Sequence, residues 1–332
     1  MSLIDPFGRR IRYLRVSVTD RCNLQCDYCR PAGEPLLPNH QQLLTMEEMV
    51  RLSRLFVTLG IDRIRLTGGE PLLRRNMVML VREMSALPGL QELSLTTNAL
   101  LLDRHADELR QAGLHRVNIS LDTLNPETFH RITRGGDLNR VLAGIEAAVR
   151  AGLKPVKINM VVMRDINDHE IPEMIAFAVR HALALRFIET MPVGRAGLGG
   201  AERYIPADEI VRRARLGDGQ EWIPVDAPKE GGAGPARYFR LAGGDAEVGI
   251  ISARSRHFCD TCNRMRLTSR GELVLCLGGE DRVDLKTLLR QGASDALLMD
   301  AIRNGVARKP ERHHFELGAE GASHWNMSGL GG

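Results

Sequence analysis

The chain has 332 residues, of which 43% are hydrophobic and 4% aromatic, and its formal net charge is +4. This length suits one large domain with a smaller addition, and the hydrophobic share is enough to bury a core. The weak positive charge permits an anionic ligand, but no dense basic stripe with interleaved aromatics indicates nucleic acid. Neither a signal peptide nor a membrane span is evident, so we expect a cytoplasmic protein. Because thiols stay reduced there, the six cysteines favour metal binding over disulfides.

The first part of the chain alternates strand-like and helix-like segments. Strands are expected at 12–18, 61–67, 91–97, 115–121, 156–162 and 185–191. Helices are expected from a capping box at Thr45 and Glu48, and at 77–87, 102–113, 138–152 and 170–182. Strict alternation implies parallel strands with crossover helices. Since a closed barrel needs about eight such units, we predict an α/β fold over residues 1–191, an open partial (β/α)6 TIM-like barrel. Its ligands should lie at the carboxyl ends of the strands.

In residues 192–332 the regular alternation of strand-like and helix-like segments ends, and the pattern predicts an α+β extension. Loops and short strands are expected near 229–251, and a hairpin with Arg270-Gly271 at its turn follows. Two helices are expected at 283–292 and 294–306, and the last ten residues are predicted to form an irregular tail.

A cysteine triplet, Cys22-x3-Cys26-x2-Cys29, follows the first predicted strand. A [4Fe–4S] cube takes four ligands, so three thiolates leave one iron open to a small chelating molecule. A structural zinc site is the alternative, but it needs a fourth Cys or His close by. No histidine lies in this loop, and the nearest following one is His40.

Two further features accompany this triplet. Tyr28 precedes the last cysteine, and Gly68-Gly69-Glu70-Pro71 ends the second predicted strand. Together they resemble the signature of the radical S-adenosylmethionine (SAM) superfamily. The resemblance implies that the open iron chelates the amino and carboxylate groups of SAM. One electron then cleaves SAM to methionine and a 5′-deoxyadenosyl radical, which abstracts hydrogen from the substrate.

A second triplet, Cys259-x2-Cys262-x13-Cys276, lies in the C-terminal extension. Taken alone it is ambiguous, because His257 could complete a Cys3His zinc site. The first triplet shifts the balance toward a second [4Fe–4S] cluster, which the α+β extension would carry. That cluster also lacks a fourth cysteine, so its open iron could face a substrate.

Nearly the whole chain resembles the GTP 3′,8-cyclases, the molybdenum cofactor biosynthesis protein A family. The matching segments are LRVSVTDRCNLQCDYC, RIRLTGGEPLLRR, LTTN, NISLDTL, VKIN, FIETMPVG, FCDTCNRMRLTSRG and the terminal Gly331-Gly332. The resemblance implies conversion of GTP to (8S)-3′,8-cyclo-7,8-dihydroguanosine 5′-triphosphate, the first step of molybdenum cofactor biosynthesis. It further implies a homodimer, and a product passed to cyclic pyranopterin monophosphate synthase. It also implies that guanine reaches the open iron of the second cluster and that the Gly-Gly tail reaches toward the active site. The sequence names no electron donor.

The resemblance also implies two sets of contact residues. The expected GTP contacts are Arg15, Arg65, Thr96, Lys157, Arg264, Met265 and Arg266. The expected SAM contacts are Tyr28, Gly69, Ser120 and Met191. Arginine forks and lysine suit a triphosphate, and side chains from different parallel strands can converge in a barrel cavity. Without the resemblance, such arginines are more often salt-bridged, the hydroxyls bonded to backbone, Met191 packed in a core and Gly69 part of a turn.

One departure from the family is visible. Ala99 follows LTTN where glycine is common, and alanine disfavours a positive φ. Two rival functions also stay open. Another radical SAM enzyme with an auxiliary cluster, such as a peptide-modifying maturase, would share the first triplet and the barrel. A non-catalytic zinc-binding interaction protein would need only the thiols.

Overall fold

The computed structural model describes residues 2–30, 42–193, 202–214, 221–226, 234–241, 247–313, 315 and 327–330. Its strands are β1 (Leu3–Ile4), β2 (Arg10–Ile11), β3 (Tyr13–Ser17), β4 (Arg63–Thr67), β5 (Glu92–Thr97), β6 (Arg116–Ser120), β7 (Lys157–Val162), β8 (Ala184–Glu189), β9 (Trp222–Val225), β10 (Arg237–Leu241), β11 (Glu247–Ile251), β12 (Arg264–Leu267), β13 (Glu272–Val274) and β14 (Arg282–Asp284). Its α-helices are α1 (Met46–Thr58), α2 (Met77–Ser85), α3 (Leu102–Gln111), α4 (Pro126–Thr133), α5 (Leu138–Arg150), α6 (Ile171–Arg180), α8 (Ala207–Arg213), α9 (Leu285–Arg290), α10 (Asp295–Val306) and α11 (Met327–Leu330).

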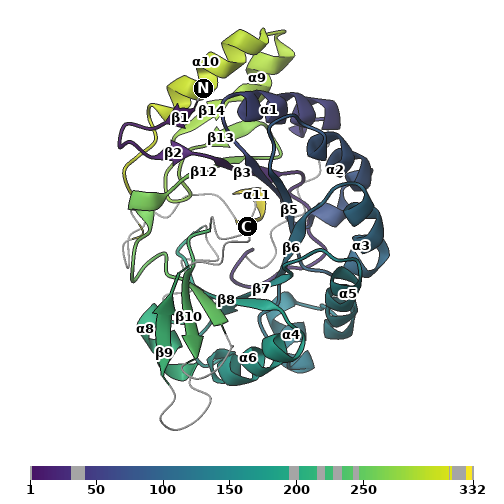
Figure 1. Ribbon diagram of the computed structural model, residues 1–332, viewed down its shortest axis with the longest axis vertical. Coiled ribbons are helices and arrows are strands. Elements are labelled where there is room, and N and C mark those ends of the chain that lie inside the picture. Colours follow the sequence, from purple (N-terminus) through teal and green to yellow (C-terminus); the bar gives the residue numbers. More distant parts are fainter. Residues whose placement is uncertain are drawn as a thin grey trace.

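Six parallel strands, β3 to β8, pair in sequence order and form the centre of one sheet. Each corresponds to one of the six predicted strands, so the predicted partial barrel is confirmed. The helices between them cover the outer face of the curved sheet (Figure 1). The capping box that begins α1 is also confirmed, because Thr45 Oγ1 accepts from Glu48 N and the Glu48 carboxylate accepts from Thr45 N. Sequence analysis did not predict α4, which Pro126 begins after an Asn125 cap.

The C-terminal region extends this same sheet at both edges. Strand β12 adds to β3 and β11 adds to β8, both in parallel, so the described sheet holds twelve strands in the order β14-β13-β12-β3-β4-β5-β6-β7-β8-β11-β10-β9. The sequence pattern placed β11 and β12 in the extension without showing that they continue the barrel. The division of the chain near residue 191 therefore stays a prediction.

The predicted hairpin is confirmed as β12 and β13, with Gly271 at φ +81° in its turn. Helices α9 and α10 match the two predicted near the C-terminus. The tail contains a short helix, α11, where only irregular structure was expected, and it lies inside the curve of the sheet (Figure 1). Gly331-Gly332 lies outside the described residues. None of the described helices has the length and apolar character that a bilayer span requires.

Candidate active site

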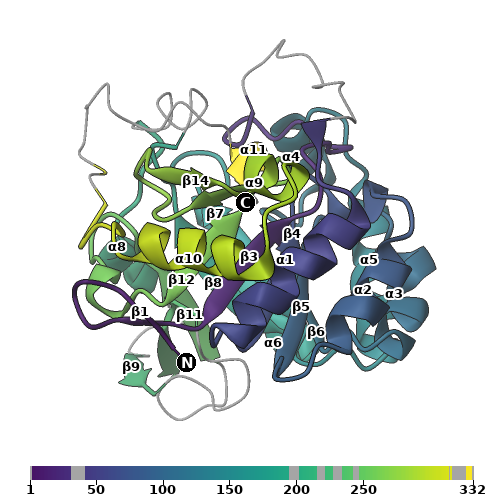
Figure 2. The same cartoon turned by 90° about the horizontal axis from the view of Figure 1, so that it is seen from above.

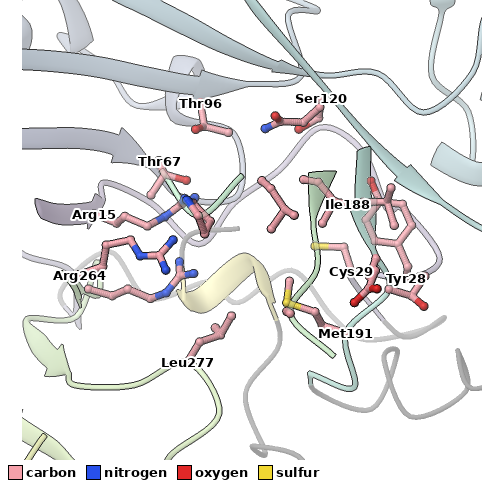
Figure 3. A pocket seen from close by; sticks show the side chains of 18 of the residues that line it. Arg15, Tyr28, Cys29, Thr67, Thr96, Ser120, Ile188, Met191, Arg264 and Leu277 are labelled. Atoms are coloured by element: carbon pink, nitrogen blue, oxygen red, sulfur yellow. The ribbon is translucent and has the colours of Figure 1, made fainter. Parts of the chain in front are cut away.

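A single cavity of about 600 Å³ opens on the inner side of the sheet. All six cysteines line it, from three segments: the loop after β3, the turn at residues 259–262 and the segment after β13. Ten of the eleven expected SAM and GTP contacts line it as well, and only Lys157 does not. Figure 3 shows Arg15 and Arg264 at one end of this cavity, with Tyr28 and Cys29 at the other. The expected ligands of two clusters and two small molecules therefore share one space.

The first triplet lies on the loop that follows β3. Its turn is fixed by backbone hydrogen bonds, since the amides of Cys29 and Arg30 both donate to Cys26 O at 3.0 Å. Burial raises the pKa of Cys22 to about 11 and that of Cys26 well above its usual range. Such thiols ionise only when a cation offsets the loss of hydration. Three cysteine sulfurs on one short loop suit an iron–sulfur cluster.

Gly68 and Gly69 fit this loop against the end of β4. The amide of Gly69 donates to Thr19 O at 2.9 Å, and that of Glu70 donates to Arg21 O at 2.7 Å. A Cβ atom on Gly69 would overlap Arg21 O, and one on Gly68 would overlap Thr19 O. Close approach of the two backbones therefore requires both glycines.

Glu70, the third residue of the Gly68-Gly69-Glu70-Pro71 motif, has a structural role. Its side chain is fully buried, and it accepts hydrogen bonds from Leu72 N at 3.0 Å, Thr97 Oγ1 at 2.8 Å and Asn98 N at 2.8 Å. Burial raises its pKa to about 7. The carboxylate is thus used to join the ends of β4 and β5, and it does not line the cavity.

Tyr28 and Asp122 form a hydrogen-bonded pair beside the first triplet. The Tyr28 hydroxyl donates to Asp122 Oδ2 at 2.6 Å, and Val161 N donates to Oδ1 at 2.8 Å. Burial raises the pKa of Asp122 to about 6. Ser120 precedes this carboxylate at the end of β6, and both line the cavity. Sequence analysis missed Asp122, although its position just past a strand end was the available signal.

Arginines crowd the other end of the cavity. Arg15, Arg65, Arg186, Arg264 and Arg266 line it from β3, β4, β8 and β12. Register explains part of this, because Arg15 is the pairing partner of both Arg65 and Arg266. Burial lowers the pKa values of four of these arginines, and the charges of neighbouring arginines lower them further. The pKa values of Arg15 and Arg65 fall below the usual range, and those of Arg186 and Arg266 fall to about 10.

The three carboxylates that line the cavity all have other partners. Asp27 pairs with Arg203 at 2.6 Å, Asp122 accepts from Tyr28, and Glu189 accepts from Ala207 N and Arg254 N. These contacts hold the three carboxylates to groups outside the set of five arginines, which gather several positive charges at one end of the cavity. Such a site favours a polyanion.

Thr96 and Lys157 show two different outcomes for the expected GTP contacts. Thr96 Oγ1 is buried in the cavity wall and has no hydrogen-bond partner among the described residues, which suits a ligand contact. Lys157 begins β7, is 1% exposed and does not line the cavity. Burial, with the charges of Arg186, Arg116 and Arg65, lowers its pKa to about 7.

The second triplet lies on the opposite wall. Cys259 begins the 3₁₀ helix η4 (Cys259–Thr261), Cys262 N donates to Cys259 O at 2.9 Å, and Cys276 follows β13. Burial raises the pKa of Cys259, whereas at Cys262 the charges of Lys309 and Arg264 outweigh burial and lower the pKa. The imidazoles of His257 and His313 come within 4.8 Å of the Cys259 sulfur. The zinc alternative thus keeps a geometric basis here.

Ala99 adopts a φ of +64°, the conformation that glycine favours. Its Cβ is fully buried in the core, which offsets part of that strain. Thr96 keeps its place, so the departure changes only the turn after β5.

Comparisons with known proteins agree with this geometry. Residues 16–178 match the Radical SAM superfamily, and residues 183–315 match Molybdenum Cofactor Synthesis C. The chain is 46% identical to the GTP 3′,8-cyclase of Hydrogenovibrio crunogenus, over the full length of both. It is 47% identical to GTP 3′,8-cyclase 1 of Pseudomonas aeruginosa, covering 96% of this chain and 95% of that one.

This chain belongs to the GTP 3′,8-cyclase family. As a member of the radical SAM superfamily it is an enzyme whose cofactors are SAM and a [4Fe–4S] cluster, and Cys22, Cys26 and Cys29 fit the cluster. Among solved structures, SuiB of Streptococcus suis bound to S-adenosylmethionine superimposes with a TM-score of 0.59 at 15% identity, covering 90% of this chain and 69% of that one. At that identity the likeness concerns the fold alone, so it gives no support to a peptide substrate.

Proposed function

We propose that this enzyme converts GTP to (8S)-3′,8-cyclo-7,8-dihydroguanosine 5′-triphosphate, the first step of molybdenum cofactor biosynthesis. The observation that carries the proposal is one cavity that both thiol triplets line, together with five arginines from β3, β4, β8 and β12. A triphosphate suits such a cluster of arginines, because guanidinium forks bind phosphate oxygens. The relatives named GTP 3′,8-cyclase, at 41–48% identity, favour this substrate over a peptide.

The residues divide between two ligands. At the first triplet, Tyr28, Gly69, Ser120 and Met191 bind SAM, and the Tyr28–Asp122 hydrogen bond holds the tyrosine ring in place. Cys22, Cys26 and Cys29 would hold the first cluster, which would supply the electron for radical cleavage of SAM and so for removal of the 3′ hydrogen of the ribose. The wall around this end is closed by apolar side chains such as Ile188 and Val161, which exclude water from the radical.

At the other end, the arginines hold the nucleotide. Arg15, Arg65, Arg264 and Arg266 bind the triphosphate, and Thr96 Oγ1 donates to the ligand. Arg186, on β8, joins this set because its guanidinium faces the same cavity. Lys157 does not line the cavity but lies buried close to its arginines, and a bound triphosphate would favour the protonated form of its amine. Met265 packs beside Arg264 and Arg266 on β12.

We assign Cys259, Cys262 and Cys276 to a second [4Fe–4S] cluster, whose open iron would receive the guanine. Three thiols line the cavity on the side opposite the first triplet, where a base would extend from a bound triphosphate. We further propose that the enzyme is a homodimer and acts in the cytoplasm with a reductant still to be identified. Its product would pass to cyclic pyranopterin monophosphate synthase.

The test is anaerobic reconstitution followed by reaction. We expect about eight irons per chain in the wild type and about four in Cys276→Ser, since each cube holds four. With SAM, a reductant and GTP, the wild type should give 5′-deoxyadenosine and the cyclised nucleotide. A colourless zinc protein, or deoxyadenosine formation that a peptide stimulates and GTP does not, would refute the proposal.

A further inference from the structure

An N-terminal arginine outside the cavity joins the segments around the second triplet. Arg9 lies between β1 and β2 and is 8% exposed. Asp5 orients it, because Arg9 Nε donates to Asp5 Oδ2 at 2.5 Å. The other oxygen of Asp5 accepts from the amides of Phe7 and Arg9, each at 3.0 Å. The guanidinium plane is therefore fixed by a short, self-contained turn.

The remaining nitrogens of Arg9 donate to three backbone carbonyls from two distant segments. Nη1 donates to Cys259 O at 2.8 Å and to Glu311 O at 2.5 Å, while Nη2 donates to Pro310 O at 2.7 Å. A rigid planar fork can satisfy Asp5 and three carbonyls together, whereas a lysine ammonium has only three donors and no fixed plane. We call residues Asp5, Arg9, Pro310 and Glu311 the clasp.

The segment that the clasp holds contacts two of the three thiols. Lys309 and His313 flank Pro310 and Glu311, are both buried and both line the cavity. The backbone amide of His313 donates to the Cys259 sulfur, and the charge of Lys309 acts on the Cys262 sulfur. Through its three carbonyl contacts, Arg9 holds this segment beside the turn that carries Cys259.

We propose that Arg9, oriented by Asp5, is a positioning residue for the second cluster, holding the Cys259 turn against residues 309–313. The inference rests on the second cluster of the proposed function. Hydrogen bonds and charges around cluster sulfurs set both the retention and the redox behaviour of a cluster. The hydrogen bonds of the Arg9 side chain go to Asp5, Cys259, Pro310 and Glu311, none of which lies in the first triplet, so its effect should be confined to the second cluster.

The experiment compares Arg9→Gln and Arg9→Lys with Arg12→Gln. Arg12 is the matched control because it lies in the same segment and its Nε donates to Asp62 at 2.7 Å, away from both triplets. After anaerobic reconstitution, Arg9→Gln should release second-cluster iron to a chelator about 10- to 100-fold more readily, the usual effect of losing such an outer contact. It should keep the first-cluster EPR signal with SAM. Arg9→Lys, which keeps the charge beside Asp5, should fold normally and show an intermediate loss.

A spectroscopic measurement separates positioning from simple stability. In a Cys26→Ser background, which leaves only the second cluster, Arg9→Lys should change the EPR signature and potential of that cluster, and Arg12→Gln should not. Unchanged iron retention and EPR in both Arg9 variants would overturn the inference. So would equal loss of both clusters that merely follows a lower melting temperature. If the wild type itself binds only about four irons, the proposed second cluster is absent, and the proposed role of Arg9 is refuted together with it.

Discussion

At the residue scale, the cavity is defined by like charges that burial brings together. Arg15, Arg65 and Arg186 each stand between two apolar residues on a parallel strand, as in Leu14-Arg15-Val16 and Leu185-Arg186-Phe187. This shared pattern was the signal for Arg186, which sequence analysis passed over because Arg186 lay in no named motif segment. Spacing alone could not show that the three strands present these side chains to one space.

Arg186→Met is expected to stabilise the ligand-free enzyme while weakening its substrate binding. Arg186 is 3% exposed, and its Nε has no hydrogen-bond partner among the described residues. Removing a buried charge that lacks a carboxylate partner should raise the free energy of unfolding by about 1 kcal/mol. GTP affinity should fall at least about 10-fold. Arg116→Met is the control, because it strands Glu92, its partner at 2.5 Å, and should destabilise the enzyme. Urea unfolding and equilibrium binding test both, and a less stable Arg186→Met would refute the argument.

Lys157 should make stability depend on pH. Its folded pKa of about 7 lies below the 10.5 of an exposed lysine. The unfolded chain therefore binds more protons between these values, and stability should rise with pH from about 7 toward 10. Lys157→Met should flatten this rise. GTP should also cause proton uptake near pH 8, measurable by calorimetry in buffers of different ionisation enthalpy. An identical pH profile in wild type and variant would contradict the assignment.

At the element scale, the first triplet depends on how its loop meets the end of β4. The family resemblance implied a SAM contact at Gly69, and the structure adds that Thr19 and Arg21 fill the space that a side chain at Gly68 or Gly69 would need. The motif was recognisable from sequence, but its reason was not, because the contact joins backbones about fifty residues apart along the chain. The same holds for Glu70, because its partners Thr97 and Asn98 lie at the end of β5.

Gly69→Ala should therefore remove the first cluster selectively. The new methyl group would overlap Arg21 O and displace the loop that carries Cys22. We expect reconstituted iron to fall to about four per chain, with loss of SAM cleavage. Gly279→Ala is the control, since its methyl would stand 3.6 Å from the Cβ of Cys276, an ordinary contact beside the second triplet. Full iron content in Gly69→Ala would show that the loop accommodates the methyl group and would contradict the prediction.

At the scale of the whole molecule, one sheet unites both triplets. The alternating pattern was sufficient to predict β3 to β8 and the helices between them, except for α4. It could not place β11 and β12, because pairing between strands far apart in sequence leaves no periodic signal. Yet β12 brings Arg264 and Arg266 beside Arg15, and the hairpin that it begins leads to Cys276. The cavity therefore exists only when the C-terminal region closes onto both edges.

A chain ending at residue 191 should consequently fail as an isolated barrel. Removal of β12 and β11 exposes the backbone edges of β3 and β8, and unpaired parallel edges promote aggregation. We expect this fragment to be insoluble, or to show rapid amide exchange in β3 and β8 where the full chain is protected. A monomeric fragment with native protection would contradict the dependence on both edges.

The most direct test of the account uses GTP carrying deuterium at the ribose 3′ position. The enzyme, reconstituted anaerobically and reduced in the presence of SAM, is mixed with this nucleotide, and the 5′-deoxyadenosine formed is analysed by mass spectrometry. If one cavity holds SAM at the first triplet and GTP among the arginines, the deoxyadenosine gains one deuterium and the cyclised product loses it. Deoxyadenosine without deuterium, formed at the same rate whether or not GTP is present, would contradict that claim.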